Sequence, residues 1–435
     1  MKFVDFDIAQ EIKTNLTNLG FVRPTDIQYK AIPSILNGED VLAIAQTGTG
    51  KTAAFAIPII NKIHSFKRNK SSKAIEAIVM VPTRELAQQI GQVFNKLCSH
   101  TRVKALAIIG GVEQDGQIDR LIKGIDVLIA TPGRMFDLIS QGYIALEEIR
   151  TLVLDEADRM LDLGFIEDIK SIKKKLKRRH QTLFFSATIN EEIKKLAYSQ
   201  VRSNAIRIQI SPENPVSKNV FHYVMFVEMD DKRFFLERFV RENPDSKILV
   251  FVRTKVRAER VAKAMERVEI QSLTLHGDKA QLLRTEAMTQ FKEGKSNILI
   301  ATDVSARGID IPMVNFVINY DLPTISENYV HRVGRTGRAF NKGIAITFCA
   351  KEEREKLEEI QGFLNKKIEE IKITKKDYYF TLNPEELEYS LNTLIDEKEV
   401  FHKKKRDKAK EKGKGKVKVK AKVKKIGKKK PGKKK

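Results

Sequence analysis

A glycine-rich segment at residues 45–52 has the residue types of a phosphate-binding loop. It directly follows the apolar run 41–45, which is typical of a buried strand, and it precedes a helical pattern. Its two glycines would let the backbone turn N–H groups toward phosphates, Lys51 could reach the terminal phosphates, and Thr52 could bind magnesium. The first position holds alanine instead of the usual glycine. We therefore predict a nucleoside triphosphate and Mg²⁺ site formed by Ala45, Gln46, Thr47, Gly48, Thr49, Gly50, Lys51 and Thr52.

An acidic tetrapeptide favours hydrolysis of that nucleotide over transfer of its phosphate. The apolar run 151–154 leads into Asp-Glu-Ala-Asp, so carboxylates stand where a strand end would face the phosphates. Asp155 would hold the magnesium, and Glu156 would orient and deprotonate the attacking water. Together with Lys51 they are the expected catalytic residues of the first half of the chain.

The elements that must position these residues are short apolar runs that alternate with helical stretches. This alternation predicts βαβ units in which helices cover both faces of a parallel sheet. The expected strands are 41–45, 77–81, 105–109, 127–130, 151–154 and 182–186, then 248–251, 272–276, 298–301, 314–320 and 344–348. A polar stretch with two prolines before residue 218 separates the two sets, which predicts two tandem α/β domains. The expected divisions are domain 1–205, linker 206–218, domain 219–370, extension 371–400 and tail 401–435.

The formal charge of +24 is concentrated at the C-terminal end. Residues 401–435 hold 20 Lys or Arg and 2 Asp or Glu, a net charge of +18. Without a packable face or charge balance, this tail is expected to be disordered and to attract a polyanion such as nucleic acid. A purely solubilising tail is the alternative.

The remaining composition points to the cytoplasm. Two cysteines cannot build a disulfide framework, and neither lies in a zinc-binding pattern. No apolar run is long enough to span a membrane, and the first residues lack the layout of a signal peptide. We expect a soluble cytoplasmic monomer without a membrane partner.

Four segments in order resemble the DEAD-box RNA helicases of helicase superfamily 2. They are AQTGTGKT, LVLDEAD, SAT at 186–188 and HRVGRTGR at 331–338, and the resemblance covers about residues 3–365. It implies two RecA-like domains and ATP-driven, nonprocessive remodelling of short RNA duplexes and RNA–protein complexes. The short basic extension further resembles the bacterial ribosome-assembly and cold-stress members, which implies ribosomal or other ribonucleoprotein complexes as partners.

The same resemblance implies a site that selects ATP over GTP. GFVRPTDIQ at residues 20–28 is similar to the family's adenine-sensing motif, with Phe3 as the isolated aromatic 17 residues before its glycine. Gln28 has the amide that can read both edges of adenine. Phe21 would also line the site, and Phe3 would stack on the base, whereas Phe6 is expected in the core.

The second domain is expected to complete the ATP site. By their place in HRVGRTGR, Arg335 and Arg338 correspond to arginine fingers, and His331 would couple the domains. Asp310 resembles the family residue that touches the ribose. ATP would thus lie between the domains and draw them together. Ser186 and Thr188 are expected to bond Asp158 and to link hydrolysis to strand separation.

A track for RNA is expected from segments that follow strands in both domains. Small residues, hydroxyls and single arginines suit phosphates and sugars, so recognition should be independent of base sequence. The family elements predict contacts from Pro82, Thr83, Arg84, Gly110, Gly111, Thr131, Pro132, Gly133 and Arg134, and from Arg253, Gly277, Thr302 and Asp303, with Gln281 and Arg284 nearby.

Two other functions remain open at this stage. One is a DNA-directed translocase of the same fold, which Gln28 and the acidic tetrapeptide disfavour. The other is an RNA clamp or chaperone whose basic tail anneals strands. Glu156, Arg335 and Arg338 argue against a purely binding role, although annealing could accompany hydrolysis.

Overall fold

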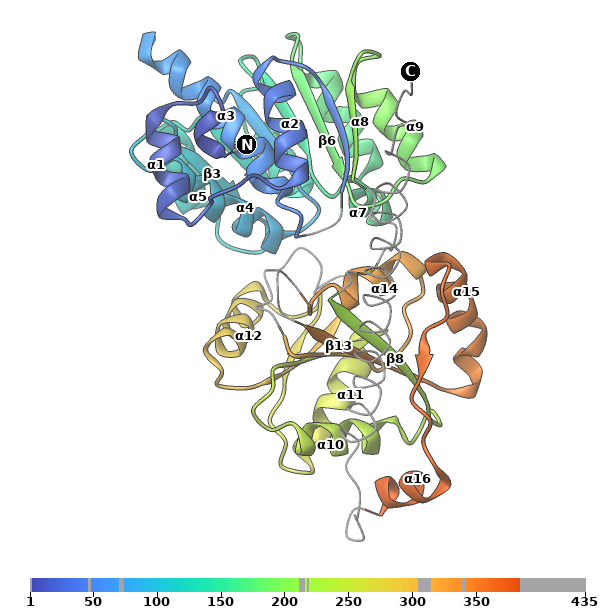
Figure 1. Cartoon of the computed structure of the whole chain (residues 1–435). Helices are drawn as coiled ribbons and strands as arrows, with labels where there is room; N and C mark the ends of the chain where they lie inside the picture. Colours follow the sequence, from blue (N-terminus) through green and yellow to red (C-terminus); the bar gives the residue numbers. More distant parts are fainter. Residues whose placement is uncertain are drawn as a thin grey trace, which may run out of the picture.

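A computed structural model describes residues 2–45, 48–69, 74–210, 216, 219–303, 314–337 and 342–383 (Figure 1). Within these residues the strands form two seven-stranded sheets, in the orders β3-β4-β2-β5-β6-β1-β7 and β10-β11-β9-β12-β13-β8-β14. Neighbouring strands run parallel throughout both sheets. The predicted fold class, two tandem α/β domains with parallel sheets, is confirmed.

Helices cover both faces of the first sheet, and its central strands, which are mostly apolar, are buried along their whole length. The strands are β1 (Val41–Ala45), β2 (Ala77–Met80), β3 (Ala105–Ile108), β4 (Val127–Ala130), β5 (Thr151–Leu154), β6 (Gln181–Ser186) and β7 (Ile206–Ile210). One face packs on α1 (Gln10–Asn18), α2 (Asp26–Leu36), α3 (Lys51–Asn69) and α4 (Arg84–Leu97). The other packs on α5 (Asp115–Ile122), α6 (Pro132–Ser140), α7 (Ala157–Asp162), α8 (Ile166–Lys175) and α9 (Glu191–Gln200).

The second sheet repeats this three-layer plan. Its strands are β8 (Val220–Phe226), β9 (Ile248–Val252), β10 (Leu273–Leu275), β11 (Ile298–Thr302), β12 (Phe316–Asn319), β13 (Gly343–Cys349) and β14 (Glu369–Glu370). One face packs on α12 (Gln281–Glu293), α14 (Ser326–Val333) and α15 (Arg354–Leu364). The opposite face packs on α10 (Lys232–Glu242) and α11 (Lys255–Glu266).

The first sheet extends beyond the expected domain boundary. Its edge strand β7 pairs with β1 from Ile206 to Ile210, inside the segment expected as a linker. In β7 only alternate residues are apolar, as suits an edge strand with one face on the core, so it lacks the continuous apolar run that predicts the other strands of this sheet.

The chain after residue 370 is an integral part of the second domain as far as it is described. Helix α16 (Lys375–Leu382) lies on α10, where the Tyr378 hydroxyl donates to Asp231 Oδ2 at 2.7 Å. Arg238 Nη1 donates to the Thr381 hydroxyl at 2.6 Å. Residues 384–435, with the rest of the expected extension and the lysine-rich tail, lie outside the described residues. No helix in the described ranges has the length and apolar character to cross a membrane.

Candidate nucleotide and RNA sites

The phosphate loop connects β1 to α3 and is held by the start of α2. Gly48 and Gly50 adopt φ values of +81° and +94°, in the left-handed region that favours glycine. Gln28 Nε2 donates to the carbonyl of Gly50 at 3.0 Å, and its Oε1 accepts from the N–H of Thr25 at 2.9 Å. A side chain on Gly50 would have its Cβ 2.4 Å from Gln28 Nε2, so this approach requires glycine. Gln46 and Thr47 lie outside the described residues.

Lys51 is a buried cation among carboxylates. It is 6% exposed, and its Nζ has no hydrogen-bond partner within the described residues. Burial raises the pKa of Asp155 to about 6, while the charge of Lys51 opposes that rise. A buried ammonium without an acceptor suits a phosphate oxygen, which could satisfy it.

The residues present fit magnesium bound together with a nucleotide. Thr52 at the start of α3 and Asp155 after β5 offer oxygen ligands, and Mg²⁺ commonly takes few protein ligands because phosphates and water supply the others. Over the described ranges, no cluster of three or more His, Cys, Asp or Glu side chains could form an all-protein metal cage.

Glu156 occupies an uncommon backbone conformation at the expected site of hydrolysis. Its φ and ψ of 52° and 49° are left-handed, and it caps the N-terminus of α7. Its carboxylate is buried, with Oε2 3.5 Å from Arg159 Nη1, and its N–H donates to Asp155 Oδ1 at 3.0 Å. Left-handed backbone in a residue other than glycine is costly and concentrates at functional sites. The turn and Arg159 therefore fix the direction of a carboxylate that could orient water.

Asp158 joins the acidic tetrapeptide to the Ser-Ala-Thr segment. Its Oδ2 accepts from the N–H groups of Ala187 and Thr188, both at 3.0 Å, and from the Thr188 hydroxyl at 3.1 Å. The Ser186 hydroxyl instead donates to the Thr188 carbonyl at 2.8 Å, so only one of the two expected hydroxyls bonds Asp158. Burial alone would raise the pKa of Asp158, but attraction by His331 of α14 and by Lys51 holds it below its usual value. The carboxylate thus interacts with both domains.

The aromatic residues near the N-terminus form one cluster. The ring centroid of Phe3 lies 6.1 Å from that of Phe6 and 6.2 Å from that of Phe21. Phe6 is a core residue, as expected, but Phe3 is equally buried, with 3% of its surface exposed. An adenine base could stack on Phe3 only after a shift of this cluster, so stacking stays a prediction.

Of the two expected arginine fingers, the described residues include one. Arg335 is buried just after α14, near His331 in the sequence. Arg338 and Asp310, the expected ribose contact, lie outside the described residues.

Gln281 and Arg284, which lie near the expected RNA track of domain 2, join the two domains. Glu85 Oε1 at the start of α4 accepts from Arg284 Nη2 at 2.6 Å and from Gln281 Nε2 at 3.2 Å. The Glu85 and Arg284 side chains are each about nine-tenths buried. This ion pair fastens α12 to the first domain beside Arg84.

We expect loss of this pair to favour separated domains. Glu85→Gln and Arg284→Gln should each destabilise the closed state, in which the domains are joined, by about 1.5–3 kcal/mol relative to separated domains. The reason is that each variant leaves a buried polar group poorly paired. RNA-stimulated ATPase reports the change, and the double variant should lose little more than either single one. Additive losses would contradict a direct contact between the two side chains.

In domain 1, the expected RNA segments meet at one edge of the sheet. Arg84 lies over Gly111, whose φ is +74° and where a Cβ would come within 2.1 Å of Arg84 Nη1. Arg134 Nη2 donates to the Val112 carbonyl at 3.0 Å, beside the same glycine turn. Thr83 and Thr131 are the N-caps of α4 and α6, with Pro82 and Pro132 adjacent and Gly133 following. Helix N-termini and arginines together suit a phosphate backbone.

In domain 2, the expected contacts come from several strand ends. Arg253 follows β9, Gly277 follows β10, and Thr302 ends β11. Asp303 follows β11, and its carboxylate accepts hydrogen bonds from Arg332 at 2.6 and 2.8 Å. Asp303 thus holds Arg332, and its contact with RNA stays a prediction.

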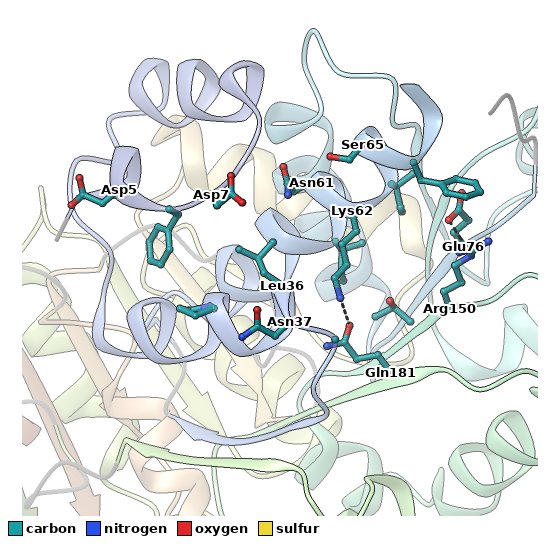
Figure 2. Close-up of a pocket in the computed structure, with 17 residues that line it drawn as sticks. Asp5, Asp7, Leu36, Asn37, Asn61, Lys62, Ser65, Glu76, Arg150 and Gln181 are labelled. Carbon is teal, nitrogen blue, oxygen red and sulfur yellow. Dashed lines mark hydrogen bonds and ion pairs between the residues drawn. The ribbon is translucent and has the colours of Figure 1, made fainter. Parts of the chain in front are cut away.

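A separate cavity of about 830 Å³ lies at the opposite end of the first sheet. Figure 2 shows Lys62 of α3 reaching across it, where Nζ donates to Gln181 Oε1 at 3.0 Å. Thr151 and Gln181 stand at the beginnings of β5 and β6, whereas Asp155 follows the end of β5. The cavity is therefore distinct from the nucleotide site.

The arrangement defines a class of protein: a tandem RecA-like nucleotide hydrolase with a phosphate loop and acidic strand end in its first domain. Comparison of the sequence with protein families agrees. Residues 25–196 match the DEAD/DEAH box helicases, and residues 231–340 match the helicase conserved C-terminal domain.

The chain is similar in sequence and structure to several RNA helicases. CshA of Geobacillus kaustophilus, a DEAD-box ATP-dependent RNA helicase, is 40% identical over 370 residues, which are 85% of this chain and 78% of that protein. The ATP-dependent RNA helicase DeaD of Buchnera aphidicola is 38% identical over 92% of this chain and 65% of its own length. A structure of S. cerevisiae Dbp5 bound to RNA and ADP BeF3 has a TM-score of 0.76 at 30% identity, over 88% of this chain and 98% of that chain.

The chain belongs to the DEAD-box ATP-dependent RNA helicase family. It is accordingly an ATP-hydrolysing enzyme that uses ATP with Mg²⁺. The predicted family, enzyme class and cofactors are confirmed.

Proposed function

We propose that the chain couples RNA-stimulated ATP hydrolysis to local, nonprocessive separation of short RNA duplexes and to remodelling of RNA–protein complexes. The carrying observation is that Lys51 and Glu156 lie in the first domain and Arg335 in the second, and that the buried ion pair of Glu85 with Arg284 joins these domains. The candidate hydrolytic groups are thus split between domains, and hydrolysis requires both domains to meet. A second copy of the chain is not needed, so it acts as a monomer.

The chain's own residues divide the work of hydrolysis. Lys51 binds the terminal phosphates. Glu156, which the left-handed turn holds in place, takes the proton from the attacking water. Arg335, with Arg338, stabilises the charge that develops on the transferred phosphoryl group. Thr52 and Asp155 would hold magnesium, which would supply positive charge beside the phosphates.

RNA binds across both domains without base reading. Arg84 and Arg134 approach one glycine turn, and the helix N-termini beside them offer N–H groups to phosphates. Because the track continues onto domain 2 at Arg253, bound RNA favours the closed arrangement, and closure completes the ATP site. Opening after hydrolysis releases the RNA.

The kind of relatives suggests the cellular setting in broad terms. We propose that the protein acts in the bacterial cytoplasm on ribosomal RNA or the RNA of other ribonucleoprotein complexes. CshA, DeaD and RhlB relatives are all RNA helicases. The tail at 401–435, with its net charge of +18, serves as an electrostatic tether for RNA.

Duplex length tests this function. Duplexes of about 10 base pairs should separate with ATP and those of about 30 should not, because each closure disrupts only a few base pairs. A chain ending at Val400 should match the full chain at saturating RNA but need more RNA to reach that rate. Equal separation of both lengths would indicate a processive translocase, and strand annealing without any ATP-dependent separation would support the clamp or chaperone.

A further inference from the structure

Arg253, an expected RNA contact, is held by a buried carboxylate. Its side chain is 47% exposed after β9, and Nη2 donates to Glu353 Oε1 at 2.9 Å. Glu353 lies in the turn between β13 and α15 and is 4% exposed. Within the described residues, the Arg253 guanidinium has no other hydrogen-bond partner, which leaves further N–H donors for a phosphate.

Glu353 is itself fixed by a fully buried cation. Its Oε2 accepts from Lys232 Nζ and from the N–H of Ala350, the latter at 3.2 Å. Lys232 is 0% exposed and also donates to the Tyr320 carbonyl at 2.7 Å. An ion pair on an exposed arginine usually contributes little because both side chains move. Here Glu353 is buried and immobile, so the ion pair fixes the direction of the Arg253 side chain at little further cost in conformational entropy.

Asp321 holds the backbone N–H of Arg253 and also contacts Arg332 in the segment HRVGRTGR. Its Oδ2 accepts from the Arg253 N–H at 3.0 Å, and its Oδ1 forms an ion pair with Arg257 Nε at 3.2 Å. The Asp321 carbonyl accepts from Arg332 Nη1 at 2.6 Å. Arg332 lies three positions before Arg335, so one buried cluster anchors both an RNA-side arginine and the arginine segment of the ATP site.

We propose that Glu353 is a positioning residue for RNA binding: anchored by Lys232, it directs the Arg253 guanidinium toward the phosphate backbone. This inference rests on the proposed RNA role of Arg253. It adds a residue from outside the family segments that the sequence singled out. The carboxylate does not touch RNA; it acts through the arginine.

The test compares Glu353→Gln with Glu352→Gln, an exposed neighbour that undergoes the same change of charge. Either substitution makes the chain more positive, which by itself would strengthen binding to RNA. We nevertheless expect Glu353→Gln to weaken binding of a labelled oligouridylate about tenfold. The plot of log affinity against log salt should become less steep, with its negative slope smaller in magnitude by about 0.7. This is the value for each phosphate that a protein neutralises on a single strand. Glu352→Gln should leave the slope as it is and should bind RNA as tightly as the unaltered chain or slightly more tightly.

Kinetics and a double variant separate positioning from loss of structure. In RNA-stimulated ATPase, Glu353→Gln should raise the half-saturating RNA concentration about tenfold and lower the rate at saturating RNA by less than about twofold. Arg253→Gln should behave alike, and the Arg253→Gln/Glu353→Gln variant should be no weaker than Arg253→Gln alone. If the buried Lys232 destabilises Glu353→Gln, the Lys232→Met/Glu353→Gln variant removes both charges and should show the same loss of affinity in a folded protein.

Two outcomes would overturn the inference. Tighter RNA binding by Glu353→Gln would mean that the carboxylate competes with phosphate for Arg253. Additive losses in the double variant would mean that Glu353 acts independently of Arg253. By contrast, an Arg253→Gln variant with unchanged affinity and salt slope would refute the RNA role of Arg253 itself, which is a failure of the proposed function.

Discussion

Replacing Glu156 with glutamine should abolish most hydrolysis and leave ATP and RNA binding intact. General-base catalysis contributes about 10²–10⁴-fold, and the amide cannot accept the proton. The amide keeps the size of the side chain, its left-handed turn and a hydrogen bond with Arg159, so the geometry around Asp155 should persist. Single-turnover hydrolysis at saturating ATP and RNA measures the chemical step, and equilibrium binding checks the two ligands.

Glu167→Gln is the matched control for this variant. Glu167 lies on the exposed side of α8, so the substitution makes the same change of charge away from the site. The control should hydrolyse ATP at the wild-type rate. If Glu156→Gln also hydrolyses near that rate, the assignment of Glu156 as the base is wrong.

Replacing Lys51 with methionine should lower hydrolysis on the order of 10²–10³-fold, as removal of one preorganised donor does elsewhere. Its ammonium is buried without a hydrogen-bond partner in the described part of the chain, so a bound phosphate gains a donor that needs no rearrangement. The lysine charge also opposes the rise in the pKa of Asp155, and its loss should raise that pKa further. Steady-state ATPase and nucleotide binding should fall together.

Lys62→Met provides a control on the same helix. Lys62 is partly buried on α3 and donates to Gln181 in the separate cavity, so its loss tests whether α3 tolerates the substitution. ATPase in this variant should remain near wild type. An equal loss of activity in both variants would attribute the effect of Lys51→Met to damage of α3 and not to weaker phosphate binding.

Local patterns in the sequence were enough for the architecture and the family. Continuous apolar runs mark strands buried on both faces, and the phosphate loop and the acidic tetrapeptide sit where parallel strands end. Continuous apolar runs did not predict β7, because in this edge strand apolar and polar residues alternate. Bounds shifted by a residue or two, as in β2, which ends at Met80.

Side-chain partners could not be predicted, because they come from distant parts of the chain. Arg284 was expected on the RNA track, yet it pairs with Glu85 of the other domain. The ion pair of Asp303 with Arg332 was likewise not foreseen. Nothing in the sequence around Glu353 distinguishes it from its acidic neighbours, and its importance follows only from its burial against Lys232. The roles of the expected site residues stay predictions until variants are measured.

Stimulation of ATPase by nucleic acid tests the central claim most directly. With no nucleic acid the rate should be low, because the domains close rarely and Arg335 does not meet the terminal phosphate. Single-stranded RNA should raise the rate strongly and double-stranded DNA should not, since the track is proposed to hold one strand of RNA. Equal stimulation by double-stranded DNA, or a high rate without any nucleic acid, would contradict RNA-driven closure.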